Sequence, residues 1–337
     1  FFYVNGISAD KDSFVNVIPT GKFRSVSAAK RPEPTGCLVP VGGGKDSALT
    51  LETLTNSGMK CRCYAINKRC SITATVTTAG LDESALITAS RRFDRSLIDL
   101  NKAGYLNGHT PFSAVVAFSA ELCACVHGLK YIALSNESSA NESYVDGTQI
   151  NHQYSKSTEF ERDFREYCEK WFGGDSRCPE YFSLLRPWSE WQIAREFVKY
   201  PQYFGIFQSC NLGSKTNSWC CNCAKCLYVY ILLAAFLDDD VLTRIFGCNM
   251  LEKQELSDML DGLALDGEDK PFECVGTKDE VRLSLEMAWE RRKSDPPALL
   301  KRWRSLFPEY APVSLENYFD RDNFVPEEFK YLLGEMQ

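Results

Sequence analysis

The sequence lacks any apolar run of about 18 residues, the length that a helix needs to cross a bilayer. Its best candidate covers residues 227–237 and predicts a helix buried in a protein core. The first residues, Phe1 to Gly6, contain no basic stretch and no long apolar core, so they do not predict a signal peptide. They also lack an initiator Met, and we expect the chain to be a piece of a longer protein. These absences favour a cytoplasmic protein that does not contact a membrane.

The sequence also lacks an excess of basic residues. It has 38 Lys and Arg against 45 Asp and Glu, which gives a net charge of −7. Proteins that bind nucleic acids usually cluster positive charge to neutralise phosphates, so this balance argues against a nucleic-acid partner. A local basic groove would still permit a tRNA substrate. The 44% of hydrophobic and 25% of charged residues are ordinary for a globular protein.

Short apolar runs alternate with helical patterns along much of the chain. The apolar runs predict buried parallel strands at residues 37–41, 61–66, 87–93, 131–134 and 181–185. Helices are expected at residues 47–57, 111–127 and 189–198. The helix at 111–127 is apolar almost all round, which predicts burial on more than one side. This alternation predicts an α/β fold with a doubly wound, mostly parallel sheet.

Composition changes divide the chain into three parts. Residues 1–35 are polar and irregular, and we interpret them as a linker or the remnant of an N-terminal region. Residues 36–210 form the expected α/β domain. Residues 211–337 begin with a cysteine-rich loop and continue as a helical C-terminal portion with proline-marked breaks.

A glycine-rich loop, Gly42-Gly43-Gly44-Lys45-Asp46-Ser47, lies between the first expected strand and the first expected helix. Three glycines let the backbone turn tightly and approach a ligand, and the N–H groups of the helix start attract an anion. Ser47 offers a hydroxyl donor, and Asp46 offers a carboxylate for Mg²⁺. The spacing fits neither a Walker A loop nor a dinucleotide-binding loop. An ordinary glycine-rich turn is the alternative interpretation.

This loop resembles the pyrophosphate-binding S-G-G-x-D-S loop (PP-loop) of the N-type ATP pyrophosphatases, with Gly42 in place of the first Ser. The resemblance implies that ATP is split between its α- and β-phosphates and that AMP activates a carboxylate or similar group. It assigns pyrophosphate binding to Gly42, Gly43, Gly44 and Ser47, and Mg²⁺ binding to Asp46. Lys45 would lie on the phosphates or in solvent. We add Asn67 and Ser135 to the expected nucleotide-binding residues.

A cysteine cluster follows the α/β domain. Cys220, Cys223 and Cys226 form C-x-x-C-x-x-C, and Cys210 precedes them by ten residues. Four thiolates can close a tetrahedral zinc site, and 15 cysteines without an export signal favour a reducing compartment. The pattern resembles the zinc site of the 7-cyano-7-deazaguanine synthases. An iron–sulfur cluster or sulfur-transfer cysteines are the alternatives. We expect a structural zinc site, with Cys221 as a packing residue.

Polar segments at residues 107–111, 135–142 and 151–156 follow or precede apolar elements where doubly wound folds bind their ligands. Solvated loops are the alternative for each segment. Residues 270–276 place a carboxylate and a thiol in a further loop, where packing is as good an explanation as chemistry.

Several segments together resemble one family, the ATP-dependent UDP-N-acetylmuramoyl-L-alanyl-L-glutamate epimerases of the MurL type. They are residues 39–47, 106–109, 134–137, 151–156, 182–187, 219–226 and 270–276. The resemblance implies ATP, Mg²⁺ and a small-molecule substrate, the UDP-N-acetylmuramoyl dipeptide, in peptidoglycan precursor synthesis. Its terminal L-Glu would be adenylated and inverted to D-Glu, with release of AMP and pyrophosphate. A ligase or thiolase acting on a nucleobase or tRNA, and a non-enzymatic nucleotide sensor, are the rival functions.

The resemblance leaves the catalytic base open, and nothing in the sequence indicates the oligomeric state. The candidates are His109, Glu137, His152, Lys156 and Cys274. We favour His152, because an imidazole exchanges protons near pH 7.

Overall fold

The computed structural model describes residues 1–8, 10, 13–18, 20–21, 32–108, 110–145, 148, 150–172, 178–268 and 270–334. Its centre is a five-stranded parallel sheet with the strand order β3-β2-β1-β4-β5. The strands are β1 (Cys37–Pro40), β2 (Cys61–Ile66), β3 (Leu86–Ala89), β4 (Tyr131–Leu134) and β5 (Glu180–Ser183). The predicted α/β class and parallel sheet are therefore confirmed.

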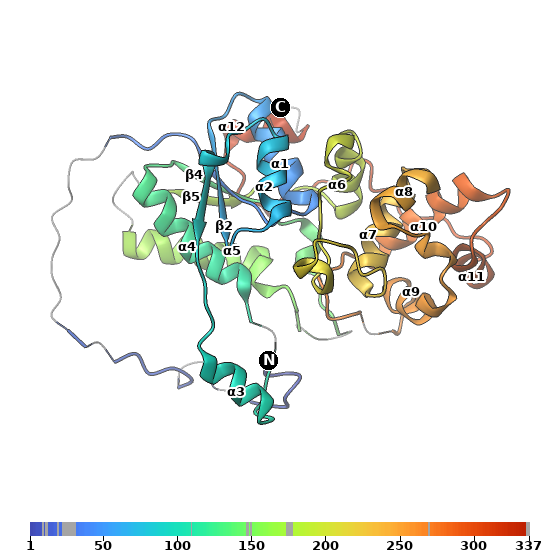
Figure 1. Cartoon of the computed structure of the whole chain (residues 1–337), viewed down its shortest axis with the longest axis horizontal. Helices are drawn as coiled ribbons and strands as arrows, with labels where there is room; N and C mark the ends of the chain where they lie inside the picture. The colour runs from blue at the N-terminus through green and yellow to red at the C-terminus, as the bar shows by residue number, and fades with distance from the viewer. Residues whose placement is uncertain are drawn as a thin grey trace.

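Helices cover both faces of this sheet (Figure 1). On one face, α1 (Lys45–Asn56) and α2 (Cys70–Thr78) pack against β1 and β2, and Phe329 of the short α12 (Glu327–Lys330) packs on β4 and β5. On the other face, α4 (Phe112–His127) packs against β1 and β4, and α5 (Thr158–Phe172) packs against β5. This two-sided cover explains why the strands read as continuous apolar runs, since every residue of β4 is buried.

The order in which the chain adds strands to the sheet reverses at β1. Chain growth from β1 proceeds outward through β2 to β3, and then returns to the other side of β1 with β4 and β5. In such sheets, the carboxyl ends of the two diverging strands open a crevice that binds ligands. The glycine-rich loop follows β1, and the 135–142 segment follows β4, so both reach this crevice.

The C-terminal helices form a second apolar core beside the sheet. They are α6 (Glu190–Phe197), α7 (Ala224–Ala234), α8 (Asp239–Phe246), α9 (Ser257–Ala264), α10 (Lys278–Arg292) and α11 (Ala298–Leu306). All 11 residues of α7 are buried among these neighbours, which confirms the buried helix predicted near residues 227–237. Figure 1 shows this helical portion at the end of the molecule away from α4 and α5.

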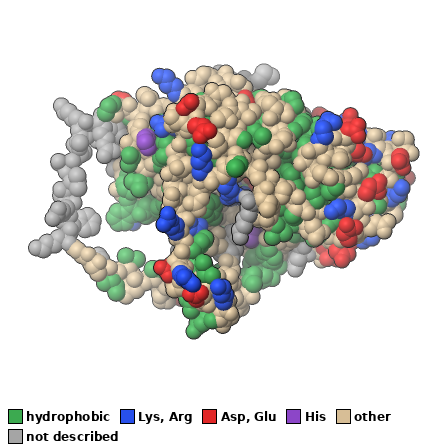
Figure 2. Space-filling model, in the orientation of Figure 1, with side chains coloured by type: hydrophobic (Ala, Val, Ile, Leu, Met, Phe, Trp, Pro, Cys, Tyr) green, Lys and Arg blue, Asp and Glu red, His purple; other side chains and the backbone are tan. Residues whose placement is uncertain are grey.

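The surface over the C-terminal helices carries charges of both signs. Figure 2 shows acidic and basic side chains interspersed at this end of the molecule, without one continuous basic area on the face drawn. Within the described residues, no helix combines the length and the apolar character needed to cross a membrane.

Two local predictions were wrong. The third strand ends at Ala89 rather than residue 93, because the following segment leaves the sheet and Arg91 bonds to Asn67. The helix α4 is buried on one side only: Ala117, Ala120 and Ala124 face the sheet, while Leu122 is 67% exposed. Small residues let α4 lie close to the strands, and its large apolar side chains then point outward.

The helix α3 (Arg95–Lys102) stands away from the sheet, with none of its residues buried. The N-terminal residues lie nearby: the Asn5 amide donates to the Asn107 carbonyl at 3.0 Å. The ring of Tyr3 lies 6.1 Å from that of Phe272.

Candidate active site

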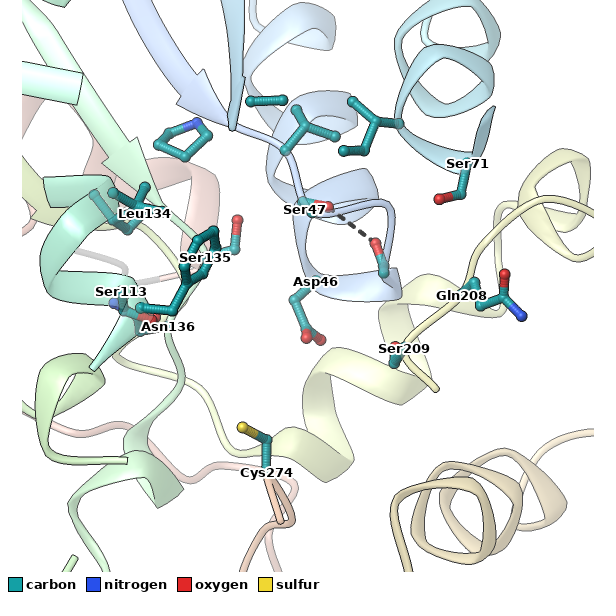
Figure 3. A pocket seen from close by; sticks show the side chains of 18 of the residues that line it. Asp46, Ser47, Ser71, Ser113, Leu134, Ser135, Asn136, Gln208, Ser209 and Cys274 are labelled. Carbon is teal, nitrogen blue, oxygen red and sulfur yellow. Dashed lines mark hydrogen bonds between the residues drawn. The ribbon is translucent and has the colours of Figure 1, made fainter. Parts of the chain in front are cut away.

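A pocket of about 350 Å³ opens at the carboxyl ends of β1, β2 and β4, in the crevice that the topology predicts. Figure 3 shows its walls: the glycine-rich loop and α1 on one side, residues 134–136 on another, and Cys274 below them. The lining is rich in polar and charged groups, including Asp46, Ser47, Ser71, Ser135, Asn136, Glu137, Lys156, Gln208, Ser209, Lys225 and Cys274.

The glycine-rich loop presents backbone N–H groups to this pocket. The six successive amides from Gly42 to Ser47 donate no hydrogen bond to another described residue. Gly44 is the N-cap of α1 and has no side chain, so it gives the helix start no side-chain hydrogen bond. The Ser47 hydroxyl donates to the Gly44 carbonyl at 3.1 Å and narrows the turn. Unpaired amides at a helix N-terminus form an anion-binding site.

Close packing explains why the loop needs glycine. Gly43 has φ +86°, a left-handed conformation that L side chains rarely adopt, and an added Cβ would lie 2.6 Å from the Ser71 Oγ. A Cβ on Gly44 would lie 3.0 Å from the Ser209 Oγ. The Gln208 amide donates to the Gly43 carbonyl at 2.7 Å. The loop is therefore held between α2 and the segment that leads to the cysteine cluster.

Lys45 does not lie in solvent, one of the two places considered from the sequence. Its ammonium is buried and forms ion pairs with Asp46 and Glu190, so it is neither in solvent nor among the pocket lining. Burial alone would lower the pKa of Lys45, but the two carboxylates raise it well above its usual value. Lys45 therefore orients the Asp46 carboxylate toward the pocket.

Positive charges surround Asp46 at the pocket. Burial alone would raise the pKa of the Asp46 carboxyl, but Lys45, Lys225 and Lys156 hold it below its ordinary value. The same burial raises the pKa of Glu190 to about 7, against the opposing effect of Lys45. Asp46 thus remains a carboxylate near neutral pH, as a magnesium ligand must be.

Three of the five candidate bases line the pocket. Glu137 is buried at the end of β4, Lys156 belongs to a short helical turn (Tyr154–Lys156), and Cys274 lies in the 270–276 loop. The Ser135 hydroxyl lines the same pocket and has no hydrogen-bond partner among the described residues. The structure therefore brings together residues from three segments that are far apart in the sequence.

Two further predicted residues, His152 and Asn67, are not among the pocket lining. The ring of His152 packs at 5.6 Å from Tyr144 and 6.1 Å from Phe272, outside the pocket lining. His109 lies outside the residues that the structure describes. Asn67 follows β2, but its side chain accepts from the Arg91 amide at 2.8 Å and donates to the Arg91 carbonyl at 3.1 Å. Our preference for His152 as the base therefore has no support from this geometry.

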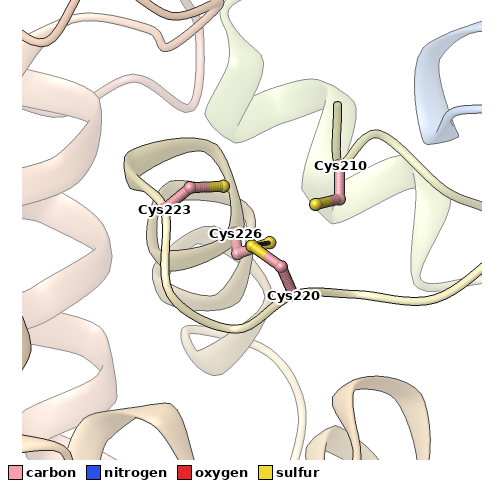
Figure 4. A group of neighbouring side chains, drawn as sticks. All are labelled: Cys210, Cys220, Cys223 and Cys226. Carbon is pink, nitrogen blue, oxygen red and sulfur yellow. Dashed lines mark hydrogen bonds between the residues drawn. The ribbon is translucent and has the colours of Figure 1, made fainter. Parts of the chain in front are cut away.

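The four cysteines predicted as metal ligands come together. The Sγ atoms of Cys210, Cys220, Cys223 and Cys226 lie within 4.8 Å of one another (Figure 4). The Gly213 amide donates to the Cys210 Sγ at 3.2 Å. Hydrogen bonds from Cys226 and the other two thiols lower the pKa of Cys223 to about 5. Four thiols at this spacing fit a tetrahedral metal site.

Cys221 is not part of this group. It is buried, and its thiol donates to the Phe246 carbonyl at 3.1 Å, in keeping with the packing role expected for it.

The cysteine group adjoins the pocket. Cys210 lines the pocket together with Gln208, Ser209 and Asn211. Lys225 lies between two of the clustered cysteines, at the start of α7, and also lines the pocket. The group therefore holds one wall of the pocket as well as the C-terminal helices.

Sequence reasoning missed several of these residues. Lys225 had a signal, because it lies inside the C-x-x-C-x-x-C motif, and Gln208 and Ser209 immediately precede Cys210. Glu190 and Ser71 had no such signal in the sequence, because each reaches the site only through the packing of another helix against α1 or its loop.

Two known domain families match this chain, and both matched ranges contribute residues to the pocket. The MurL N-terminal domain matches residues 1–184, and the MurL C-terminal domain matches residues 206–317. The curated relatives are each named UDP-N-acetyl-alpha-D-muramoyl-L-alanyl-L-glutamate epimerase. The protein from Salinispora tropica is 39% identical over 75% of this chain and 56% of its own length. The proteins from Xanthomonas oryzae pv. oryzae and Micromonospora sp. are 35% and 34% identical over 83% and 81% of this chain.

These matches cover 62% and 61% of the Xanthomonas and Micromonospora proteins, so the chain spans less than two thirds of the length of the curated relatives it matches. The family inferred from short motifs is nevertheless confirmed, since both domains match in order and the first alone covers 184 of 337 residues. The chain that builds this pocket belongs to the MurL family.

Proposed function

We propose that this chain catalyses the ATP-dependent inversion of the terminal L-Glu of UDP-N-acetylmuramoyl-L-alanyl-L-glutamate to D-Glu, in peptidoglycan precursor synthesis. The observation that carries the proposal is the row of amides from Gly42 to Ser47, which find no acceptor among the described residues and lie beside a pocket lined by proton-transfer candidates. The names of the curated relatives supply the substrate.

Activation by ATP answers a chemical difficulty. The α-proton beside a carboxylate is scarcely acidic, because removing it would place a second negative charge next to the first. Adenylation of the carboxylate removes the first charge and lets the carbonyl hold the second as an enolate. A base can then take the proton, and reprotonation on the opposite face inverts the centre. Hydrolysis of the adenylate releases the product and AMP.

The pocket offers suitable groups for ATP and magnesium. The amides of residues 42–47 would bind the pyrophosphate portion, because they are unpaired and lie at a helix N-terminus. Asp46 would bind Mg²⁺, which would neutralise phosphate charge. Lys225 lines the same pocket and would add positive charge opposite the phosphates.

The cysteine group would hold zinc in a structural role. Its donor set consists of four thiols, which leaves no open ligand position for a reacting water. Its contribution to the reaction would be to hold the wall formed by residues 208–211 and by Lys225.

The test is an incubation of the purified chain with ATP, Mg²⁺ and UDP-N-acetylmuramoyl-L-alanyl-L-glutamate. AMP is measured directly, and glutamate released by hydrolysis is analysed for chirality. We expect D-Glu and AMP to appear together and only when all three reagents are present. AMP without inversion would favour the ligase or thiolase, ATP binding without AMP would favour the nucleotide sensor, and either result would contradict the proposal.

A pair of variants links the activity to the loop. Asp46→Asn removes the proposed magnesium ligand and should abolish both AMP release and inversion. Cys123→Ser changes a half-buried cysteine of α4 that lies outside the pocket, and it should leave both rates unchanged. Equal loss in the two variants would show that the effect comes from folding rather than from the site.

A further inference from the structure

The 270–276 loop is braced on both sides of Cys274. The Tyr144 hydroxyl donates to the Glu273 carbonyl at 2.8 Å and approaches the Val275 carbonyl at 3.4 Å. Tyr144 is itself buried, with 1% of its surface exposed. One side chain from a distant segment therefore fixes the backbone before and after the cysteine.

Further contacts hold the same loop. The Gln153 side-chain amide donates to the Tyr144 hydroxyl at 2.8 Å, and the Lys156 ammonium donates to the Oε1 of Gln153 at 3.2 Å. From the opposite side, the Lys225 backbone amide donates to the Glu273 carboxylate at 3.1 Å. Groups held on rigid supports in this way are what catalysis requires, because small displacements of a reacting group reduce the rate strongly.

This bracing directs the Cys274 thiol into the pocket. Figure 3 shows the thiol pointing toward the space between Asp46 and Asn136. Lys156 and Glu137 line the same space. Burial alone would lower the pKa of Lys156, but its interactions with Cys274, Glu137 and Asp46 raise it above its usual value. An ammonium therefore persists beside the thiol.

We propose that Cys274 and Lys156 are the two proton-transfer groups of the reaction, an inference that rests on the function proposed above. The Cys274 thiolate removes the α-proton of the activated glutamyl residue: the C–H bond breaks, an S–H bond forms, and the electron pair moves onto the carbonyl oxygen as an enolate. The Lys156 ammonium donates a proton to the opposite face: an N–H bond breaks and a C–H bond forms. Proton return from the thiol to the amine restores both groups.

The surrounding groups fit this assignment. Glu137 is a buried carboxylate whose charge holds the Lys156 ammonium in its protonated form. The ring of His152 packs on Tyr144 and Phe272 and is not among the side chains that line the pocket, so it supports the loop from outside the lining. Cys274 is thus the thiol placed to reach a substrate, whereas the clustered cysteines are turned toward one another.

The experiment compares two reactions of one enzyme. Wild type, Cys274→Ala, Lys156→Gln and the control Cys123→Ser are assayed with ATP, Mg²⁺ and the dipeptide substrate in D₂O. AMP release reports adenylation, whereas deuterium at the α-carbon and the yield of D-Glu report proton transfer. Loss of an acid–base group reduces a rate by about 10²–10⁴-fold. We expect both pocket variants to lose inversion by at least about 100-fold, while AMP release stays within a few-fold of wild type.

Each outcome bears on one proposal. If wild type itself neither inverts the substrate nor incorporates deuterium, the proposed function fails and the assignment falls with it. If wild type is active and the Cys274→Ala variant still inverts at a similar rate, the assignment to Cys274 is overturned while the function stands. Retained inversion in Lys156→Gln overturns the second group in the same way. Circular dichroism of each variant checks that the fold is intact.

Discussion

Gly43 has a conformation and a neighbour that only glycine accommodates. Its φ of +86° lies in the left-handed region, and a Cβ would meet Ser71. Strain of this kind costs about 1–3 kcal/mol, so Gly43→Ala should lower the free energy of unfolding by roughly that amount and displace the loop amides. Urea unfolding and AMP release measure the two effects. Gly205→Ala, at a position with free space around it, is the control and should change neither.

Two buried carboxyl groups give the protein a dependence on pH. Burial, reinforced by the charge of Glu190, raises the pKa of Glu280 to about 8, from an ordinary value of 4.5. The pKa of Glu190 is raised to about 7 in the same way. Between about pH 5 and pH 8 the folded state therefore holds more protons than the unfolded chain. The stability that these groups contribute is present at the acidic end and is lost as the pH rises.

Glu280→Gln tests this sign. The Gln side chain stays neutral at all pH values. The unfolding free energy of wild type should therefore fall relative to that of the variant as the pH rises from 5 to 8. Urea midpoints at four pH values measure it. Two curves that run parallel across this range would mean that Glu280 is already ionised in the folded protein.

At the scale of elements, the cysteine group connects α7 to the glycine-rich loop. Cys210 ends the segment whose Gln208 amide bonds to Gly43, and Cys223 precedes α7, which carries Lys225. A metal bound there would hold both pieces of the pocket wall at once. Loss of the metal should consequently affect ATP binding, although no thiol of the group needs to touch ATP.

Cys223→Ser checks this connection. We expect about one zinc per chain in wild type and almost none in the variant. ATP binding should weaken roughly tenfold or more, the equivalent of one lost charge-assisted hydrogen bond. Elemental analysis and calorimetry give the two readouts, and finding iron with labile sulfide in place of zinc would favour the iron–sulfur alternative. Cys221→Ser is the matched control, because this buried thiol lies outside the group.

Over the whole molecule, the C-terminal helical core and the outer face of α4 differ in what they contribute to stability. Ile231 of α7 is fully buried, whereas Leu122 of α4 is 67% exposed. Ile231→Ala should destabilise the protein by about 2–5 kcal/mol, and Leu122→Ala by less than about 0.5 kcal/mol. Urea unfolding of the two variants measures the difference. A large loss for Leu122→Ala would mean that α4 is covered on both sides after all.

Most of the fold could be predicted from the sequence because its signals are local. The apolar runs at residues 61–66 and 131–134 coincide with β2 and β4, and the strand–glycine–helix order placed the loop at the start of α1. The thiol spacing brought the cysteine group together because three of its members lie within one turn and a helix start. The edge of the sheet at which the pocket lies could also be predicted, because the carboxyl ends of parallel strands lie at the same edge.

The composition of the pocket depended on contacts between distant segments. Lys45 is buried because Glu190, 145 residues further along the chain, provides its counter-charge. Lys156 and Cys274 line the pocket because Tyr144 and Gln153 hold the segments that carry them. The ring of His152 packs against Tyr144, outside the pocket lining. The sequence by itself determined the sheet, the glycine-rich loop and the thiol cluster, since each follows from short-range periodicity and spacing. Only the tertiary structure decided which titratable groups face one another, because burial and charge pairing arise when distant elements pack.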